Sequence, residues 1–186
     1  MSVEALKQTI AVARGVLENT SKEQLSQSTP CAEWDVSGLI NHMVGAHYFF
    51  EMGLTGKPSG DMTTDFAAGD FLSAYDDAAN ACVAAFSADG VMEKMHKPPF
   101  GEMPGSAVVG LAMTDTFTHA WDLAKATGQN TDLAPQTAEV LLAGARQSIQ
   151  PGFRSEEGSV FGLEKTAPAG ASKADELAAF LGRDVS

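Results

Sequence analysis

Asp115 and His119 lie four positions apart in a segment whose apolar periodicity predicts a helix. A helix turns about 100° per residue, so a four-residue step brings the carboxylate and the imidazole onto one face. This face also carries the apolar residues Val108, Leu111, Ala112, Leu123 and Ala126. An acid in such a core-facing surface needs a compensating charge, which a divalent metal ion would provide. The spacing is equally compatible with a simple hydrogen bond between an acid and a histidine.

A third ligand would come from another helix, and the predicted helix over 36–53 carries two histidines. His47 lies near the centre of the apolar face of that helix, and His42 lies towards its edge. Because a histidine on an apolar face is more often a hydrogen-bonded core residue than a ligand, helical periodicity does not choose between them. Three protein ligands of this type would leave a coordination position open for water or substrate, as in catalytic zinc sites. His96, in a proline-rich loop beside two lysines, is expected to be exposed.

Five further residues belong either to the site or to the core. Asp122 lies one turn beyond the histidine of the pair, where it would orient that imidazole as a hydrogen-bonded carboxylate or pair with a base on the helix surface. Trp34 and Trp121 are expected to be packing residues. Cys31 and Cys82 are far apart and form no CxxC pair, so we expect two small buried hydrophobic side chains in a reducing compartment.

The apolar periodicity predicts an all-α chain with few or no strands. Asp35 is suited to cap the second helix, and Gly128 is suited to end the fourth. Loops rich in Gly and Pro are expected at 55–69 and 97–105. The predicted helices cover residues 3–17, 36–53, 71–86, 106–126 and 135–149, with a short closing helix between Ser172 and Gly182. We therefore expect an antiparallel helical bundle.

The composition is that of one globular domain spanning residues 1–186. Acidic residues number 24 and basic residues 12, a net charge of −12, so a basic footprint for nucleic acid is absent and we expect no nucleic-acid partner. No segment approaches the ~18 apolar residues that a membrane span needs, and no basic stretch followed by an apolar run opens the chain. We therefore expect a cytoplasmic protein that binds no membrane.

Four segments carry a resemblance to a known family. They are TPCAEWDV at 29–36 leading into LINH at 39–42, PFGEMPG at 99–105, HAWDLA at 119–124 with ATGQ at 126–129, and LGRD at 181–184. In this order they resemble the DinB-like superfamily and, within it, the actinobacterial metal-binding proteins related to mycothiol-dependent maleylpyruvate isomerase. The resemblance implies a DinB-like antiparallel four-helix bundle with an extra short C-terminal helix.

The resemblance also implies a metal site. In that family a histidine at the position of His42 binds a divalent metal, and an acid–x–x–x–histidine pair, here Asp115 and His119, completes the ligand set. His47 then becomes a neighbour of the site. Zinc is the first expectation, with nickel and iron as alternatives. The isomerase that the chain resembles has a Glu at the position of Asp115, and Asp is one methylene shorter, so we expect the affinity and the choice of metal to differ.

The function that the resemblance implies is thiol chemistry. Members of the superfamily include S-transferases and an isomerase that use mycothiol or similar low-molecular-weight thiols, and a metal-bound thiol loses its proton. We therefore expect a metal- and thiol-dependent transferase that acts on small electrophiles, with the loops at 55–69 and 98–105 as pocket walls. Since the isomerase has an additional C-terminal domain, we do not expect maleylpyruvate isomerisation itself. The alternative is a non-catalytic metal- or small-ligand-binding bundle, and a homodimer stays open; no catalytic or thiol-binding side chain is identified.

Overall fold

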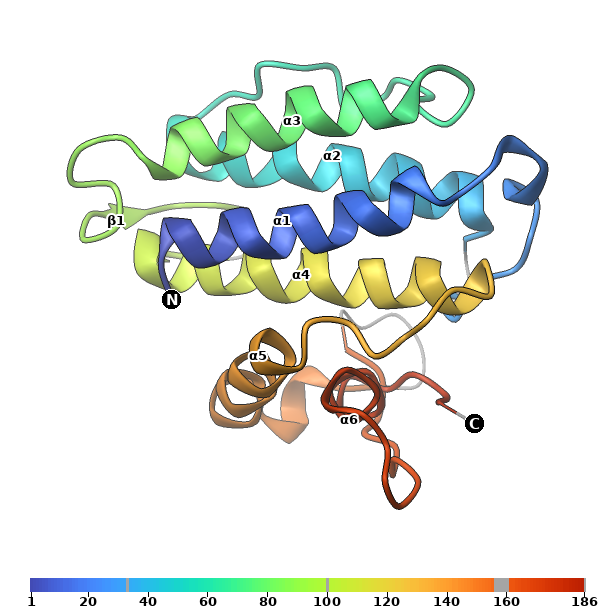
Figure 1. Cartoon of the computed structure of the whole chain (residues 1–186). Helices are drawn as coiled ribbons and strands as arrows, with labels where there is room; N and C mark the ends of the chain where they lie inside the picture. The colour runs from blue at the N-terminus through green and yellow to red at the C-terminus, as the bar shows by residue number, and fades with distance from the viewer. Residues whose placement is uncertain (33, 100, 156–160, 186) are drawn as a thin grey trace.

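Within the residues that the structure describes (1–32, 34–99, 101–155 and 161–185), this computed structural model contains six α-helices and one very short antiparallel strand pair (Figure 1). The helices are α1 (Val3–Glu18), α2 (Val36–Thr55), α3 (Phe71–Phe86), α4 (Gly105–Ala126), α5 (Pro135–Ser148) and α6 (Lys173–Phe180), the strands are β1 (Met95–His96) and β2 (Met103–Pro104), and two 3-10 turns cover Lys22–Gln24 and Pro151–Phe153. The six predicted helices are all confirmed. None of them is long and apolar enough to cross a lipid bilayer.

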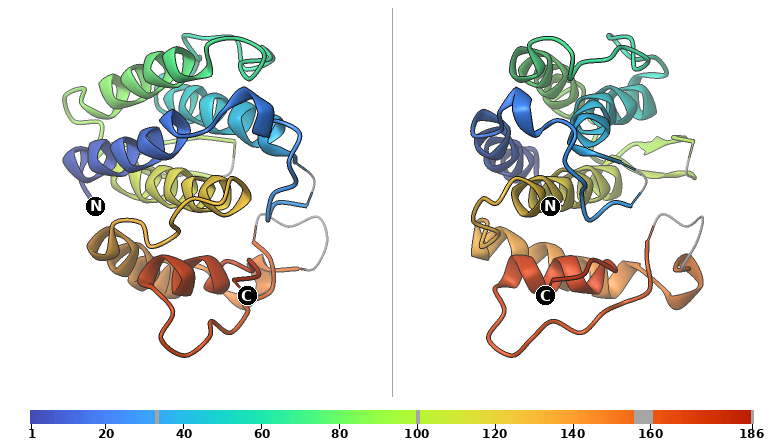
Figure 2. Two further views of the ribbon diagram at one scale, coloured as in Figure 1. Left: turned by 45° about the vertical axis from the view of Figure 1, so that its right-hand side comes forward. Right: turned by 90° about the vertical axis from the view of Figure 1, so that its right-hand side faces the viewer.

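The helices α1–α4 pack side by side as a bundle in which α1 and α2 each contact both α3 and α4 (Figure 1). α1 and α4 run in one direction and α2 and α3 in the other, because the 56–70 loop carries the chain back along the outside of the bundle. The bundle therefore combines antiparallel pairs, such as α2 with α4, with two parallel pairs. α5 and α6 contact each other and pack against α4 on the side away from α1–α3 (Figure 2).

α4 is covered by α1 and α2 on one side and by α5 and α6 on the other. As a result, every residue from 116 to 124 is buried, and the polar side chains among them must find partners within the protein. Trp121, one of the largest fully buried side chains, donates from Nε1 to Oδ1 of Asp175 in α6 at 2.8 Å. Its predicted packing role is confirmed, and this bond ties α6 to the bundle.

Local sequence determines where α2 begins and ends. The carboxylate of Asp35 accepts a hydrogen bond from the backbone N–H of Gly38 at 2.8 Å, which is the cap that the sequence predicts. Gly56 ends the helix with a φ of 86°, a left-handed conformation that favours glycine because it has no Cβ. Because α2 begins at Val36, His42 lies in its second turn.

The connection between α3 and α4 contains the β1–β2 pair, and the structure corrects one prediction there. His96 is only 6% exposed, and its Nε2 lies 2.9 Å from the carbonyl oxygen of Val91. The predicted exposure of His96 was wrong, because the strand pair folds the imidazole back onto the preceding turn, where it has a partner. Pro98 lies against Gly53 of α2, and Phe100, part of a segment that carries the family resemblance, lies outside the described residues.

His47 of α2 points into the core and is 1% exposed. Its ring packs edge-on against Tyr75 of α3, with the ring centroids 4.9 Å apart. Among the described residues, neither ring nitrogen of His47 nor the hydroxyl of Tyr75 has a hydrogen-bond partner. Burial lowers the pKa of His47 to about 4, so its imidazole is neutral near pH 7.

We expect the variant His47→Phe to be less sensitive to acid than the wild type. The pKa of His47 is about 4 in the folded protein and about 6.5 in an unfolded chain, so between these values the unfolded state binds more protons. The stabilisation by neutral His47 is complete above the unfolded pKa and is lost as the pH falls towards the folded pKa, by up to about 3 kcal/mol.

Denaturant unfolding at a series of pH values between about 7 and about 4 measures this effect. The free energy of unfolding of the variant, relative to that of the wild type, should rise steadily as the pH falls. A difference that stays constant across this range would show that His47 does not titrate there.

Candidate metal centre

His42, Asp115 and His119 converge where α2 packs against α4. His42 lies in the second turn of α2, and the other two residues lie one turn apart on α4. Their nearest donor atoms all lie within 4.8 Å of one another. The structure thus brings together the three residues expected as ligands, which supply two imidazole nitrogens and a carboxylate oxygen, all donors that divalent metals accept.

The distances within this trio suit a shared metal ion better than they suit hydrogen bonds. Oδ1 of Asp115 lies 3.4 Å from Nε2 of His42 and 3.6 Å from Nε2 of His119, both longer than the roughly 2.9 Å typical of an N–H···O bond. Two ligand atoms at zinc distances of about 2.0–2.1 Å and a tetrahedral angle lie roughly 3.3–3.4 Å apart. The two distances from Asp115 are therefore close to those between neighbouring ligands of one metal ion.

The trio is open to solvent on one side. The side chains of His42 and Asp115 are 29% and 26% exposed, whereas that of His119 is 10% exposed. Burial alone would raise the pKa of Asp115, but His119 and His42 hold it below its usual range. Burial alone would lower the pKa of His119, but Asp115 and Asp122 raise it to about 10. Metal binding through His119 would therefore release a proton.

The indole of Trp34 lies over the two imidazoles. It stacks on His42 with centroids 4.4 Å apart and is tilted against His119 at 5.7 Å. A Cβ at Gly38 would lie 3.3 Å from Cβ of Trp34, so the bare backbone there leaves room for the indole. Trp34 packs as expected, but it packs on the imidazoles of His42 and His119 as well as on the core. Glu33 beside it lies outside the described residues.

Asp122 supports His119 from the opposite edge of the ring. Its carboxylate is fully buried, and Oδ2 lies 3.0 Å from Nδ1 of His119. A carboxylate at Nδ1 keeps the proton on that nitrogen, so Nε2, which faces the trio, is the nitrogen that gives up its proton when a metal binds. Burial would raise the pKa of Asp122, but His119 and Arg183 lower it to about 2, so the carboxylate stays charged. The sequence allowed Asp122 either to orient His119 or to pair with a base on the helix surface. The contact with Nδ1 of His119 and the burial of Asp122 support the orienting role.

Arg183 and Cys31 also reach Asp122, and reasoning from residue types missed both. Arg183 donates to the two carboxylate oxygens, from Nε at 3.2 Å and from Nη2 at 3.0 Å. Cys31 is partly exposed, and its thiol donates to Oδ2 of Asp122 at 3.1 Å. The expected buried hydrophobic role is wrong for Cys31 and right for Cys82. Both missed residues lie in segments that carry the family resemblance, but nothing in the sequence indicated that those segments meet.

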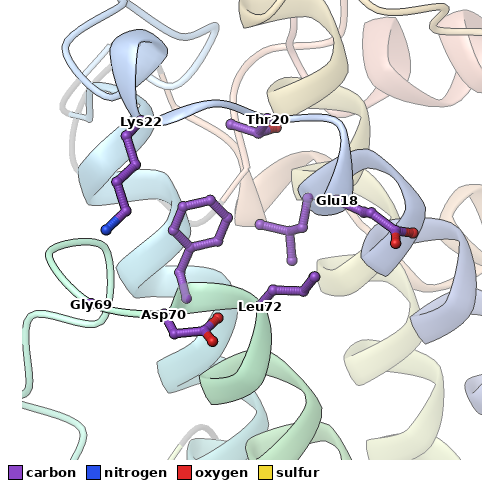
Figure 3. Close-up of a pocket in the computed structure, with 8 residues that line it drawn as sticks. Glu18, Thr20, Lys22, Gly69, Asp70 and Leu72 are labelled. Atoms are coloured by element: carbon purple, nitrogen blue, oxygen red, sulfur yellow. The ribbon is translucent and has the colours of Figure 1, made fainter.

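A surface pocket lies elsewhere, between the end of α1 and the start of α3 (Figure 3). It is lined by Leu17, Glu18, Thr20, Lys22, Gly69, Asp70, Phe71 and Leu72. None of these residues belongs to the trio or to the cluster around Asp122. His47 does not join the trio either, because its ring is turned into the core against Tyr75.

Replacing Asp122 with Asn should weaken metal binding without removing a ligand. Asn keeps the shape of the side chain but loses the negative charge that His119 and Arg183 face, and changes of this kind cost about 10- to 100-fold in metal affinity. We expect a rise of that size in the zinc dissociation constant, measured by competition with a chromophoric chelator. Asp175→Asn is the matched control, since Asp175 contacts α4 through Trp121. Equal affinities of Asp122→Asn and wild type would contradict the orienting role.

The sequence matches a known family over most of the bundle. The family described as "Mycothiol maleylpyruvate isomerase N-terminal domain" matches residues 6–124. Two uncharacterised proteins, from two strains of Mycobacterium tuberculosis, are each 43% identical over 171 residues, which cover 91% of this chain and 91% of the relative.

The fold is also found in solved structures. The crystal structure of the mycothiol-dependent maleylpyruvate isomerase matches with a TM-score of 0.58 and 14% identity over 76% of this chain and 66% of that chain. A histidine-to-alanine mutant of that isomerase matches with a TM-score of 0.56 and 13% identity over 83% of this chain and 75% of that chain. At such identities the likeness shows the fold alone, and the matched region spans about two thirds of the isomerase. The predicted DinB-like helical architecture is confirmed, and the chain belongs to the mycothiol maleylpyruvate isomerase N-terminal domain family.

Proposed function

We propose that this protein holds a divalent metal ion through His42, Asp115 and His119 and uses it to activate a low-molecular-weight thiol of the mycothiol type for transfer to a small electrophile. The observation that carries the proposal is the spacing of the trio, in which the Asp115 oxygen lies 3.4 Å and 3.6 Å from the two imidazole nitrogens. The partial exposure of His42 and Asp115 leaves a side from which a thiol can approach.

Two imidazoles and one carboxylate are typical of catalytic zinc sites, which keep a coordination position open. Zinc is our first expectation, and nickel and iron are the alternatives because both accept the same ligands. When bound, such an ion would lower the pKa of a coordinated thiol so that the sulfur is a thiolate at neutral pH. The thiol is inferred from the family, whose solved isomerase is described as mycothiol-dependent.

The side chains of this protein would prepare the site in three ways. Asp122 holds the Nδ1 proton of His119, which leaves Nε2 free to bind. Once metal binding has removed the proton from His119, Asp115 brings the one negative charge to two neutral imidazoles, so the positive charge of a divalent ion would not be cancelled and would attract an anionic sulfur. Trp34 covers one face of His42, where its indole limits the access of water and offers a flat surface to an apolar electrophile.

A non-catalytic metal-binding role is the second candidate. It is favoured by the position of the pocket in Figure 3, which is lined by residues of α1, α3 and their connections and not by the trio. Binding of a metal without turnover would then serve stability or metal storage. The two candidates differ in whether a thiol is consumed at the loaded site.

Metal binding should depend on the trio. We expect wild type reconstituted with zinc to hold about one ion per chain, and His42→Ala, Asp115→Ala and His119→Ala each to lower the zinc affinity by at least about tenfold. His96→Gln is the control, because glutamine can keep the hydrogen bond to Val91. Elemental analysis after dialysis against a fixed free zinc concentration measures the content. Unchanged zinc in His42→Ala would remove that residue from the ligand set.

Thiol activation should require the loaded site. We expect the zinc-loaded wild type to accelerate the reaction of mycothiol with an aryl chloride such as 1-chloro-2,4-dinitrobenzene, in which a sulfur–carbon bond replaces the carbon–chlorine bond and chloride and the thiol proton are released. The metal-free protein and His42→Ala should leave the rate at that of the uncatalysed reaction, followed by the absorbance of the thioether. Zinc binding by wild type without acceleration of this reaction or of the same reaction with bacillithiol would favour the non-catalytic role.

A further inference from the structure

His119 faces two groups of metal-binding side chains, one at each ring nitrogen. Nε2 faces Asp115 at 3.6 Å, within the trio. Nδ1 faces Asp122 at 3.0 Å and the sulfur of Cys31 at 3.9 Å. The donor atoms of Cys31, His119 and Asp122 also lie within 4.8 Å of one another. The imidazole of His119 therefore belongs to two groups of three side chains, each of which could hold a metal ion.

The second set is chemically a strong competitor for a metal ion. Thiolate, imidazole and carboxylate are all zinc ligands, and the sulfur makes this set softer than the trio, which has none. An ion bound there would take Nδ1 of His119 and displace the proton that now faces Asp122. It would also alter the electron density at Nε2, on which the trio depends. A functional trio therefore needs this second position to be closed to metals.

The guanidinium of Arg183 fills this position. It donates to both oxygens of Asp122, at 3.2 Å and 3.0 Å, and Nη2 also lies 3.4 Å from Sγ of Cys31. The side chain of Arg183 is 14% exposed, and that of Asp122 is fully buried. A guanidinium stays charged throughout the physiological pH range and pairs with a carboxylate through two bonds at once, so it neutralises Asp122 permanently.

The backbone around Arg183 holds the guanidinium in place. Gly182 has a φ of 96°, and a Cβ there would lie 2.7 Å from Cα of Gly162, so only glycine allows the two segments to approach so closely. The backbone N–H of Arg183 donates to the carbonyl of Ala178 at 2.9 Å, and Nη1 donates to that of Leu181 at 3.2 Å. The arginine is thus anchored at the end of α6 and directed at α4.

We propose that Arg183 is a positioning residue that acts as the resident cation of the Cys31–Asp122 cluster and so reserves His119 for metal binding through Nε2. The inference rests on the proposed metal centre. Without Arg183, the thiol of Cys31 and Nδ1 of His119 would each release a proton to solvent on binding an ion, and Cys31, Asp122 and Nδ1 of His119 would form a second metal site.

Titration of the metal-free protein with cobalt(II) tests this role, because a thiolate ligand adds an intense near-ultraviolet charge-transfer band that nitrogen and oxygen ligands do not produce. We expect wild type to bind one cobalt per chain without this band. Arg183→Met should bind a second cobalt and show the band, and Arg183→Met with Cys31→Ser should lose the band. Far-UV circular dichroism confirms that each variant is folded.

Arg154→Met is the matched control. Arg154 is a second arginine that supports the same C-terminal segment, through the carbonyls of Gly162 and Phe180. It should behave as wild type, and a thiolate band in this variant would show that loosening of the segment, not the loss of the guanidinium at Asp122, opens the cluster. That result would overturn the proposal.

The remaining outcomes separate the two proposals. Cobalt binding by wild type together with no Cys31-dependent band in Arg183→Met would overturn the role of Arg183 and leave the metal centre standing. Absence of cobalt binding by wild type would overturn the proposed metal centre at His42, Asp115 and His119. The role of Arg183 would fall with it, because that role rests on the metal centre. Should Arg183→Met fail to fold, nitrogen-15 NMR of zinc-loaded wild type decides: zinc on Nε2 of His119 with a protonated Nδ1 supports the proposal, and zinc on Nδ1 overturns it.

Discussion

The burial of one negative charge, the carboxylate of Asp122, is the constraint on which the functional part of this molecule depends. α4 is covered by helices on both sides, so water cannot solvate this group and protein partners must do so. His119 and Arg183 provide that compensation at 3.0 Å each. Removing one partner of a buried pair of this kind costs about 3–5 kcal/mol, far more than a surface ion pair contributes. The same charge therefore orients the imidazole of His119 and holds the C-terminal segment to α4.

This arrangement divides the trio into a rigid part and an accessible part. His119 is buried, and its ring is oriented through Nδ1, so the direction of Nε2 is set before any ligand arrives. His42 and Asp115 lie on the solvent side and are about a quarter exposed. Trp34 contacts both the rigid and the accessible part, because its indole stacks on His42 and packs at a tilt against His119. A preorganised nitrogen beside two accessible donors suits a site that exchanges its outer ligand.

The family match and the local contacts extend over different parts of the chain. The matched region, residues 6–124, contains all three residues of the trio together with Asp122, but it ends before α6. Arg183, which neutralises Asp122, follows α6 and therefore comes from outside that region. In this protein the environment of His119 is thus completed by the chain's own C-terminal residues, which α6 docks on α4 through the bond between Trp121 and Asp175.

The sequence by itself determined the helices and the pairing of Asp115 with His119, because caps such as Asp35, terminators such as Gly56 and helical periodicity all act within a few residues. The choice of His42 over His47 already required a family resemblance, since helical periodicity places His47 at the centre of the apolar face of α2 and His42 at its edge and does not choose between them. Only the tertiary structure decided that Cys31 and Arg183 meet Asp122, across 91 and 61 positions of the chain. No local pattern records such contacts, because they depend on how a loop and a C-terminal turn dock on α4. For the same reason only the fold revealed that His96 is buried and that the imidazole of His119 faces two groups of side chains that could hold a metal ion.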